Sequence, residues 1–330
     1  MNTDDKNPPI TITKAIQAYL ESVSMTRSIH TARSYGNGLA LFREILTNHK
    51  LPPDTTSTQE LKEDAITWLA AALKDFSPAT EQLYLAATKG YYEYLAAENL
   101  SDINLPRLKL LIHQRSRRPG IRLPQFPRND IESILQYAIN LADLQTDSPG
   151  IAMRNLRDRA FLITLADTGL RIHEICALRR GDLDWNEGRA TIIGKGNREA
   201  VVRFSERSLS ALRDYINARA KSDGASGRPL TSLPLFARHD KGAGKKIKPI
   251  TTATGRNIVA QRVGEALGIE ATGKITPHSF RHYFVTTVLR ASGNLKLAQE
   301  LARHKNIQVT QRYAHLSDDE LDKGYFEIFN

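Results

Sequence analysis

The stretch NLRDRAFLITLADTGL, residues 155–170, carries the strongest helix signal in the chain. Its apolar residues recur at helical spacing, and Gly169 is a natural helix terminator. RIHEICALRRGDL follows at residues 171–183 and predicts a shorter helix. The pattern then changes to two β-type runs, RATIIG and EAVVRF, which the Gly/Asn turn KGNR joins. Residues 189–204 therefore predict a hairpin.

Helical periodicity dominates the chain on both sides of this hairpin. Residues 11–105 predict a small bundle of four helices. Within it, Ser57 and Glu60 have the spacing of a capping box that opens a helix to about Leu73. A Gly/Ser/Pro-rich loop is predicted for residues 222–250, with helices before and after it. The sequence thus predicts a mainly α protein with a small β-hairpin or sheet.

The segment NLPRLKLLIHQRSRRPGIRLPQFPRND, residues 104–130, is basic and rich in proline. Its weak periodicity predicts an extended linker between two domains. Arg115, Arg117 and Arg118 would suit a strap that lies along a DNA phosphate backbone. A solvated basic linker with no partner would have the same composition.

The overall composition is that of a globular protein, with 41% hydrophobic and 25% charged residues. No apolar run approaches the roughly 18 residues of a membrane span. The acidic, polar N-terminus resembles neither a signal peptide nor a transit peptide. The single Cys176 excludes an internal disulfide and a cysteine-rich zinc site. We therefore expect a cytoplasmic protein with no membrane partner.

The net charge of +10 is unevenly distributed. Residues 1–115 contain 12 Lys and Arg against 13 Asp and Glu, whereas residues 116–330 contain 34 against 23. A basic region of this kind is typical of proteins with a polyanion partner, most often nucleic acid. A basic surface that only keeps the protein in solution would give the same totals, so charge alone does not decide between the two.

Several polar residues in this basic region have spacings that suggest one site. Arg171 and Glu174 lie one helical turn apart. The other members are His278 and Arg281 in PHSFRH, Lys195 in the hairpin turn, and His304 and Tyr313 in LARHKNIQVTQRYAH. Each of these residues alone would more often have a structural role at a surface, a cap or a core edge.

Together these side chains have the chemistry needed to break a phosphodiester bond. Two arginines can bind the non-bridging oxygens and neutralise the charge that grows as phosphorus becomes pentavalent. A tyrosine hydroxyl, with an ordinary pKa of about 10, becomes a useful nucleophile only where cations surround it. A lysine can protonate the leaving oxygen, and histidines donate further hydrogen bonds. No metal or other cofactor is expected, because the arginines supply the positive charge and no obvious carboxylate cluster exists.

The motifs TGLRIHEICAL, IIGKGNRE, HSFRH and LARHKNIQVTQRY resemble, in order and separation, those of tyrosine recombinases, the family of phage integrases and Xer-type site-specific recombinases. The resemblance spans roughly residues 11–316. It implies a helical core-binding bundle over residues 1–110, a basic linker over 111–127 and a mixed α/β catalytic domain over 128–330 that ends in a docking helix at 318–330. It also implies that the two domains form a C-shaped clamp around DNA.

The resemblance further implies a role for each member of the proposed site. Arg171 and Arg281 would clamp the phosphate, and Tyr313 would be the nucleophile that forms a 3′-phosphotyrosyl link. Lys195 would be the general acid, His278 would handle a proton at the phosphate, and His304 would donate a hydrogen bond to the phosphate. Glu174 would support the site without doing chemistry.

Ala302-Arg303-His304 departs from the Leu-Gly-His that this family usually has, in which glycine lets the helix end tightly. Arg303 either points to solvent or adds a DNA phosphate contact. A second alternative concerns His278 and His282, which are four residues apart and could mimic a metal-binding pair. The glutamate of a zincin-type motif is missing between them, which argues against that alternative.

The implied function is metal-free site-specific recombination of double-stranded DNA by an Xer-like, transposon or other mobile-element resolvase or integrase. Four active sites are needed, which implies a homotetramer on two duplexes, with a related recombinase or accessory protein as a further candidate partner. The last helix has an apolar surface that predicts docking on a neighbouring subunit or, alternatively, on its own domain: Leu321, Tyr325, Phe326, Ile328 and Phe329. A type IB topoisomerase, a non-catalytic DNA-binding regulator and a metal-dependent nuclease are the alternative functions.

Overall fold

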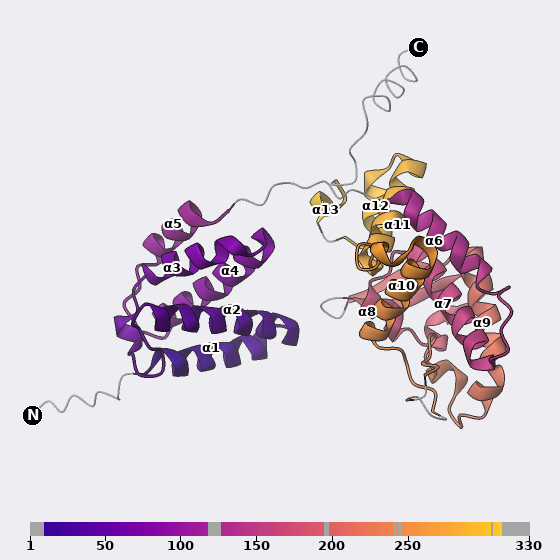
Figure 1. The fold of residues 1–330 in the computed structure, drawn as a ribbon, viewed down its shortest axis with the longest axis horizontal. Coiled ribbons are helices and arrows are strands. Elements are labelled where there is room, and N and C mark those ends of the chain that lie inside the picture. Colours follow the sequence, from indigo (N-terminus) through magenta and orange to yellow (C-terminus); the bar gives the residue numbers. More distant parts are fainter. Residues whose placement is uncertain are drawn as a thin grey trace, which may run out of the picture. The chain divides into compact units, whose positions relative to one another are not determined.

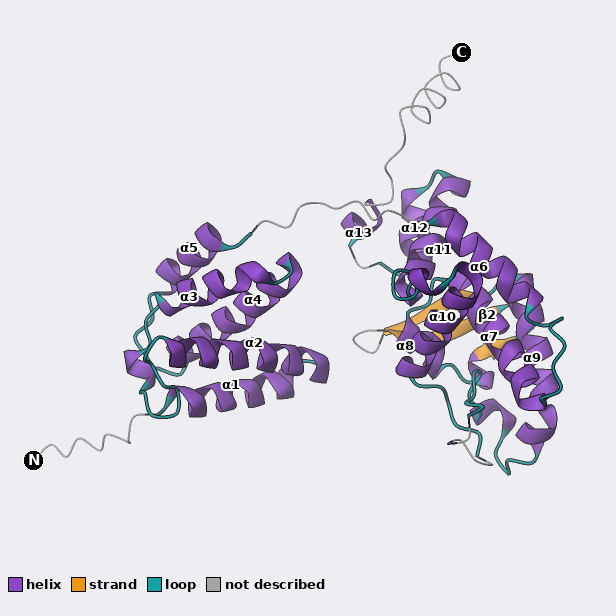
Figure 2. Cartoon of the chain, in the orientation of Figure 1, coloured by secondary structure: helices purple, strands orange, loops and turns teal. Residues whose placement is uncertain are grey.

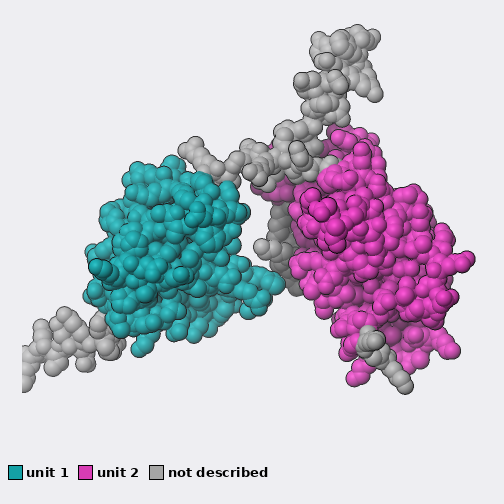
Figure 3. Space-filling view, in the orientation of Figure 1, with its two compact units in different colours: residues 1–122 teal, residues 123–330 magenta. Residues whose placement is uncertain are grey.

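The computed structural model describes residues 10–117, 127–194, 198–240, 242, 246–304 and 306–311. The chain divides into two compact units, Met1–Arg122 (unit 1) and Leu123–Asn330 (unit 2), which Figure 3 shows in different colours. The boundary falls within residues 111–127, the segment that the sequence predicted as the linker. Each unit has its own hydrophobic core.

Unit 1 is a bundle of helices (Figure 1). They are α1 (Ile12–Thr26), α2 (Ile29–Asn48), α3 (Ala65–Ala72), α4 (Pro78–Ala97) and α5 (Leu105–Arg115), with short 3-10 turns at Thr58–Glu60 and Leu73–Asp75. The side-chain oxygens of Thr11, Ser28 and Ser77 cap α1, α2 and α4 by accepting a backbone N–H of the first turn. The buried core contains Tyr91 and Tyr92 from α4, so aromatic packing joins the helices.

The predicted capping box at Ser57 is confirmed, but the helix that it opens is shorter than predicted. The Glu60 carboxylate accepts a hydrogen bond from the Ser57 backbone N–H at 3.1 Å. The turn stops at Leu61, which adopts an extended conformation, and α3 begins only at Ala65. A local capping motif therefore fixes where a turn begins, whereas tertiary packing decides how far it continues.

The structure corrects the extended conformation predicted for the first part of the linker segment, because Leu105–Arg115 form α5. Asn104 caps this helix, and Pro106 lies in its first turn, where the missing N–H removes no helical hydrogen bond. Leu108 is fully buried in the bundle. The proline that suggested a linker therefore marks the start of a helix.

The three arginines predicted to form a DNA-binding strap have different surroundings. Arg115 is exposed at the end of α5, and Arg118 lies outside the described residues. Arg117 donates from Nε to the Glu81 carboxylate and from Nη2 to the carbonyl of Phe76 at 2.6 Å. Because the Glu81 side chain is fully buried, Arg117 supplies a cation that this carboxylate needs. The DNA contact of these arginines stays a prediction.

Unit 2 consists of helices and a small antiparallel sheet, which is drawn in orange in Figure 2. The helices are α6 (Arg128–Asn140), α7 (Pro149–Thr168), α8 (Ile172–Ala177), α9 (Glu206–Gly224), α10 (Thr252–Leu267), α11 (Pro277–Ser292), α12 (Leu295–Ala302) and α13 (Ile307–Gln311). The strands, in the order β1-β2-β3, are β1 (Leu183–Asp184), β2 (Arg189–Gly194) and β3 (Arg198–Arg203). The predicted hairpin is confirmed, with Ile192 opposite Ala200. The two-residue strand β1 was not predicted.

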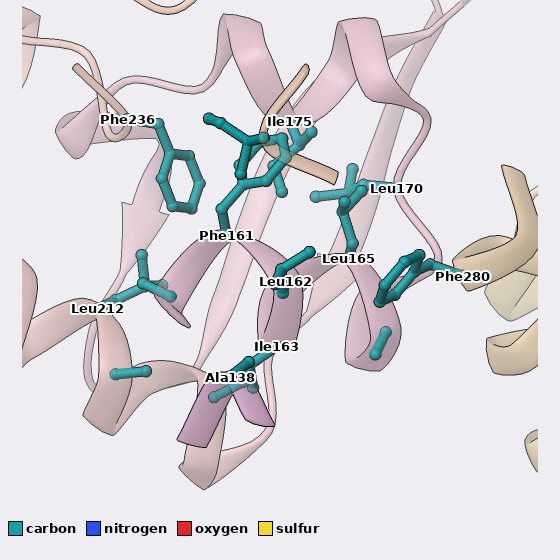
Figure 4. Close-up of a cluster of buried hydrophobic side chains, with 14 of the residues drawn as sticks. Ala138, Phe161, Leu162, Ile163, Leu165, Leu170, Ile175, Leu212, Phe236 and Phe280 are labelled. Atoms are coloured by element: carbon teal, nitrogen blue, oxygen red, sulfur yellow. The ribbon is translucent and has the colours of Figure 1, made fainter. Parts of the chain in front are cut away.

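Helix α7 lies at the centre of unit 2 because it packs against α6, α9 and α11. Figure 4 shows side chains of α7, such as Phe161 and Leu165, in one buried cluster. Ile175 of α8, Phe280 of α11 and Phe236, which lies between α9 and α10, join the same cluster. The mainly helical fold with a small sheet is thus the one predicted. No helix in the described parts of the chain is both long enough and apolar enough to cross a membrane.

Candidate active site

The turn between α7 and α8 positions the first candidate residue. α7 ends at Thr168, and Gly169 follows in a left-handed conformation with a φ of 57°. A Cβ atom at this position would overlap the ring of Phe284, so glycine is required for both its conformation and its lack of a side chain. The turn then leads directly to Arg171, which is the N-cap residue of α8.

Arg171 is held by Glu174 and still presents part of its side chain to solvent. Its backbone N–H donates to Glu174 Oε2 at 2.8 Å, and its Nη1 donates to Oε1 at 2.9 Å. The Arg171 side chain is 41% exposed, whereas that of Glu174 is 1% exposed. Because Arg171 precedes the first helical residue, the pair joins an N-cap to the first turn rather than two positions on one helix face. Arg171 and Glu174, one helical turn apart in the sequence, thus contact each other.

Arg281 connects three segments of unit 2. It lies on α11 and is only 3% exposed. Its Nη1 donates to the carbonyl of Gly169, and its Nη2 donates to the carbonyl of Ala302 at the end of α12. The guanidinium group therefore ties the turn before Arg171 to the loop that precedes His304. Arg171 and Arg281, far apart in sequence, are brought into one site.

Arg303 ends α12 in the left-handed conformation, with a φ of 57°. Its backbone N–H donates to the carbonyl of Glu300, and that of His304 donates to the carbonyl of Gln299, each at 3.0 Å. This is the Schellman arrangement, in which glycine is the usual residue at the left-handed position. A residue with a Cβ adopts that conformation at a cost of about 1–2 kcal/mol.

The side chain of Arg303 turns inward, so the alternative in which it points to solvent is wrong. The side chain is 12% exposed. Its Nη2 donates to Glu174 Oε2 at 3.2 Å and to the carbonyl of Gly169 at 3.3 Å. Its Nε is buried and has no acceptor among the described residues. The other alternative, a DNA phosphate contact, stays a prediction.

Glu174 is ionised despite its burial. Burial acts to raise its pKa, but the hydrogen bond from the Arg171 backbone and the charges of Arg303 and Arg171 outweigh it, so the pKa lies below its ordinary value. Two guanidinium groups, those of Arg171 and Arg303, thus share the Glu174 carboxylate among the residues that the structure describes, and the Arg281 guanidinium lies beside them at the Gly169 carbonyl. Arg171 and Arg303 together carry one more positive charge than Glu174 balances, which suits this cluster to bind an anion.

The three histidines of this region are neutral near pH 7. Burial lowers the pKa of His304 to about 4, and the charges of Arg281 and Arg171 act in the same direction. Burial also lowers the pKa of His282 to about 4, and burial together with Arg281 places the pKa of His278 below its ordinary value. The charge of Arg281 contributes to the lowered pKa of all three histidines. A neutral imidazole there can both donate and accept a hydrogen bond.

His304 is oriented by a contact that the sequence did not reveal. Its Nδ1 lies 2.9 Å from Oγ1 of Thr310, a fully buried residue of α13. The hydroxyl can donate to Nδ1, which leaves the imidazole proton on Nε2, available to a phosphate oxygen. The Gln299 side chain also donates to the His304 carbonyl at 3.0 Å.

The remaining predicted members of the site are Lys195 and Tyr313, which lie outside the described residues, as does segment 318–330. Among the described residues, no group of three or more His, Cys, Asp or Glu side chains is placed to hold a metal ion. The structure therefore brings together Arg171, Glu174 and Arg281 with the two candidate histidines, His278 and His304.

Comparison with known proteins identifies the family. The model of the phage integrase family matches residues 125–320, and that of the phage integrase N-terminal SAM-like domain matches residues 16–99. The chain belongs to the phage integrase family of tyrosine recombinases. The protein is therefore a site-specific DNA recombinase, an enzyme that transfers DNA strands.

Known relatives support this assignment along most of the chain. The tyrosine recombinase XerC of Xylella fastidiosa (strain 9a5c) is 32% identical over 258 residues, which cover 76% of this recombinase and 75% of XerC. XerH bound to a palindromic difH substrate matches with a TM-score of 0.67 and 18% identity, covering 96% of this chain and 84% of that one. The Tn1549 transposon integrase in complex with transposon right end DNA matches with a TM-score of 0.64 and 19% identity, covering 97% and 100%. At such identities the two structures establish a shared fold.

Two features of the recombinase site were missed by sequence reasoning. Thr310 gave no signal, because its contact with His304 depends on how α13 packs. The inward orientation of Arg303 had a partial signal, since an arginine at a helix end that favours glycine is unusual. Its partner could not be deduced, because Glu174 and Arg303 are 129 residues apart.

Proposed function

We propose that Tyr313 attacks the scissile phosphate of a recombination site while Arg171 and Arg281 bind its non-bridging oxygens. The observation that carries this proposal is that the Arg171 and Arg303 guanidinium groups share the single carboxylate of Glu174, while the Arg171 side chain is 41% exposed. Charge on the phosphate oxygens grows towards the pentavalent transition state, so fixed cations stabilise that state more than the ground state. Their positions are set before DNA arrives by buried contacts of Arg281 and by the N-cap of α8.

The covalent step is balanced without a cofactor. The bond between Tyr313 Oη and phosphorus forms as the bond to the 5′-oxygen breaks, which leaves a 3′-phosphotyrosyl link. The tyrosine proton passes to neutral His278, and Lys195 donates a proton to the departing 5′-oxygen. His304 donates a hydrogen bond from Nε2 to a phosphate oxygen. A 5′-hydroxyl of the partner strand then attacks the phosphotyrosine, so exchange proceeds without ATP.

The decisive experiment uses a suicide DNA substrate that is nicked near the cleavage point, so that the freed fragment diffuses away and the covalent intermediate accumulates. We expect a protein–DNA adduct with the wild-type protein and none with Tyr313→Phe. EDTA should leave the adduct yield unchanged, whereas its loss would favour a metal-dependent nuclease. An adduct of equal yield with Tyr313→Phe would refute the role of Tyr313.

The cognate DNA substrate also separates the remaining functions. Exchange between two cognate sites is expected of a recombinase, whereas relaxation of supercoils without pairing of sites would indicate topoisomerase activity. A non-catalytic regulator would bind DNA without forming any adduct. Binding should weaken steeply as salt rises, because cations of unit 2 displace counterions from DNA. An affinity that does not change with salt would contradict this mode of binding.

The proposed assembly is a homotetramer on two DNA duplexes. Four active sites are required to exchange all strands of two duplexes, which supports a tetramer. The apolar residues of segment 318–330 would dock on a neighbouring subunit. Deletion of residues 320–330 should leave binding to a single site intact and impair the pairing of sites. Unchanged recombination by the truncated protein would refute the docking.

The biological role that we propose is that of an Xer-like resolvase or a mobile-element integrase acting on cytoplasmic DNA. The similarity to XerC supports the first alternative, and the fold shared with the Tn1549 transposon integrase supports the second. Sequencing of DNA that copurifies with Tyr313→Phe would distinguish chromosomal sites from transposon ends. A related recombinase or an accessory protein is proposed as a partner where one chain alone does not complete exchange.

A further inference from the structure

Arg303 combines a strained backbone with a buried, ion-paired side chain. Its φ of 57° is that of a glycine position, and it ends the helix that leads to His304. Glycine would make the same two backbone hydrogen bonds without the Cβ strain, since those bonds involve only main-chain atoms. The feature that glycine would lack is the guanidinium group, so the contacts of that group indicate its role.

The Arg303 guanidinium contacts the two groups that hold the proposed phosphate-binding arginines. Glu174 accepts hydrogen bonds from Arg171 and from Arg303. The Gly169 carbonyl accepts from Arg281 and from Arg303. Arg303 is therefore a third cation at the junction of the turn after α7, the start of α8 and the end of α12.

The electrostatic consequence concerns Arg171. Glu174 is almost fully buried and lies 2.9 Å from Arg171 Nη1, so without another cation its charge would largely cancel that of Arg171. Arg303 supplies the other cation from the buried side at 3.2 Å. Arg171 is the member of this group whose side chain is 41% exposed, so the positive charge that remains is available to a ligand.

We propose that Arg303 is a positioning residue, which neutralises Glu174 and fixes the Gly169 turn so that Arg171 retains its charge and orientation for the DNA phosphate. The inference rests on the proposed function of Arg171 and deepens it. It requires no contact between Arg303 and DNA. A direct phosphate contact would act instead on DNA affinity, and the two roles therefore predict different measurements.

The first test compares Arg303→Gly, Arg303→Lys and a matched control, Lys50→Gly. Lys50 is an exposed cation in unit 1 with a φ of 62°. Its replacement by glycine therefore also removes one positive charge and relieves one left-handed backbone conformation. On the suicide substrate we expect the cleavage rate of Arg303→Gly to fall at least about tenfold and that of Arg303→Lys to fall less. Lys50→Gly should cleave at the wild-type rate.

DNA affinity and folding are measured on the same variants. Arg303→Gly should bind cognate DNA within about twofold of wild type, with the same salt slope. A phosphate contact would instead weaken binding and reduce that slope by about one, which would overturn the proposal. The urea midpoint of Arg303→Gly should fall, because loss of the cation beside buried Glu174 outweighs the relieved backbone, so cleavage rates are compared per folded molecule. A rate that falls only in proportion to the unfolded fraction would also overturn it.

The second test asks whether Arg303 acts through Glu174. In a Glu174→Gln background, where no carboxylate needs a second cation, Arg303→Gly should reduce cleavage less than about threefold. An equal loss in both backgrounds, or no loss in either, would overturn the proposal. The Arg303→Lys variant is measured in both backgrounds as well. Lysine keeps a Cβ at this left-handed position, so its effect does not include relief of backbone strain. Absence of a Tyr313-dependent adduct in the wild type would overturn the proposed function itself, and with it this role for Arg303.

Discussion

Two arginine clusters of unit 2 are built from the same chemical groups but differ in charge balance. The first, the Arg262 cluster, contains Arg157, Arg262, Asp158 and Glu265. Arg262 forms ion pairs with Asp158 and Glu265, each at 2.8 Å, and Arg157 forms one with Asp158 at 2.7 Å. Two cations thus meet two carboxylates. In the candidate site, the guanidinium groups of Arg171 and Arg303 meet the single carboxylate of Glu174 among the described residues.

The comparison separates stability from function. A balanced buried cluster satisfies its own charges, so it holds α7 and α10 together and leaves nothing for a ligand. An unbalanced cluster retains positive potential, which a phosphate can neutralise. Burial of arginine therefore does not by itself indicate a binding site, whereas a cluster with more guanidinium groups than carboxylates does. Substitutions in the two clusters should have different consequences.

The largest effect is expected for Arg171→Lys. Lysine retains the charge but lacks the planar fork that binds two phosphate oxygens, so cleavage of the suicide substrate should fall by about 10²–10³-fold. Because the side chain is 41% exposed, the free energy of unfolding should change by less than about 1 kcal/mol. Rapid-quench cleavage and urea unfolding test the two parts. A loss of stability with normal cleavage would place Arg171 with the structural cluster.

Arg262→Met should have the opposite signature. Removal of one cation leaves the buried Asp158 carboxylate less well paired, and we expect a loss of about 3 kcal/mol in the free energy of unfolding. The cleavage rate per folded molecule should match that of the wild type under conditions in which the variant is folded. If the rate fell at full folding, the distinction between the clusters would be wrong.

The histidines near the unbalanced cluster predict a pH effect on stability. The pKa of His282 and of His304 is lowered from 6.5 to about 4 in the folded protein. Between these values the unfolded chain binds more protons than the folded one, so their contribution is complete above pH 6.5 and is lost as pH falls towards 4. Urea unfolding at a series of pH values should show this decline, and His282→Asn should reduce its slope. Constant stability across this range would contradict the lowered pKa values.

The smallest effect is expected for Thr310→Val, which removes the hydroxyl that orients His304. Loss of one buried hydrogen bond should cost about 1 kcal/mol, equivalent to a fall in cleavage rate of about fivefold. The control is Thr164→Val in α7, because the buried Thr164 hydroxyl has no partner among the described residues. That control should cleave normally. Equal effects of the two substitutions would show that the His304 contact has no specific role.

Elements with strong local signals were predictable from the sequence. Gly169 and the hairpin at residues 189–204 depend on backbone preferences that short stretches of sequence express. Helix α5 was missed because Pro106 and the basic residues resemble a linker, and β1 was missed because two residues carry no pattern. Local reasoning can locate a helix end or a turn, but it cannot decide how far packing extends a helix.

The candidate site was predictable in its residue types but not in its charge balance. Arg171 and Glu174 are close in sequence, so their contact follows from local geometry. The contacts of Arg281 with Gly169 and of Arg303 with Glu174 arise only when α11 and the end of α12 meet the turn after α7. The sequence suggested solvent or DNA for Arg303, because nothing near it in the chain revealed a buried carboxylate.

Replacement of the scissile phosphate of the suicide substrate with an uncharged methylphosphonate tests directly whether the arginine charge acts on the phosphate. If the positive charge of Arg171 neutralises the phosphate, Arg171→Ala should cleave the neutral linkage much faster than it cleaves the natural one. On the neutral linkage, its rate should lie within about tenfold of the wild-type rate. Equally slow cleavage of both linkages by Arg171→Ala would contradict the account, because the charge of the arginine would then have no counterpart on the substrate.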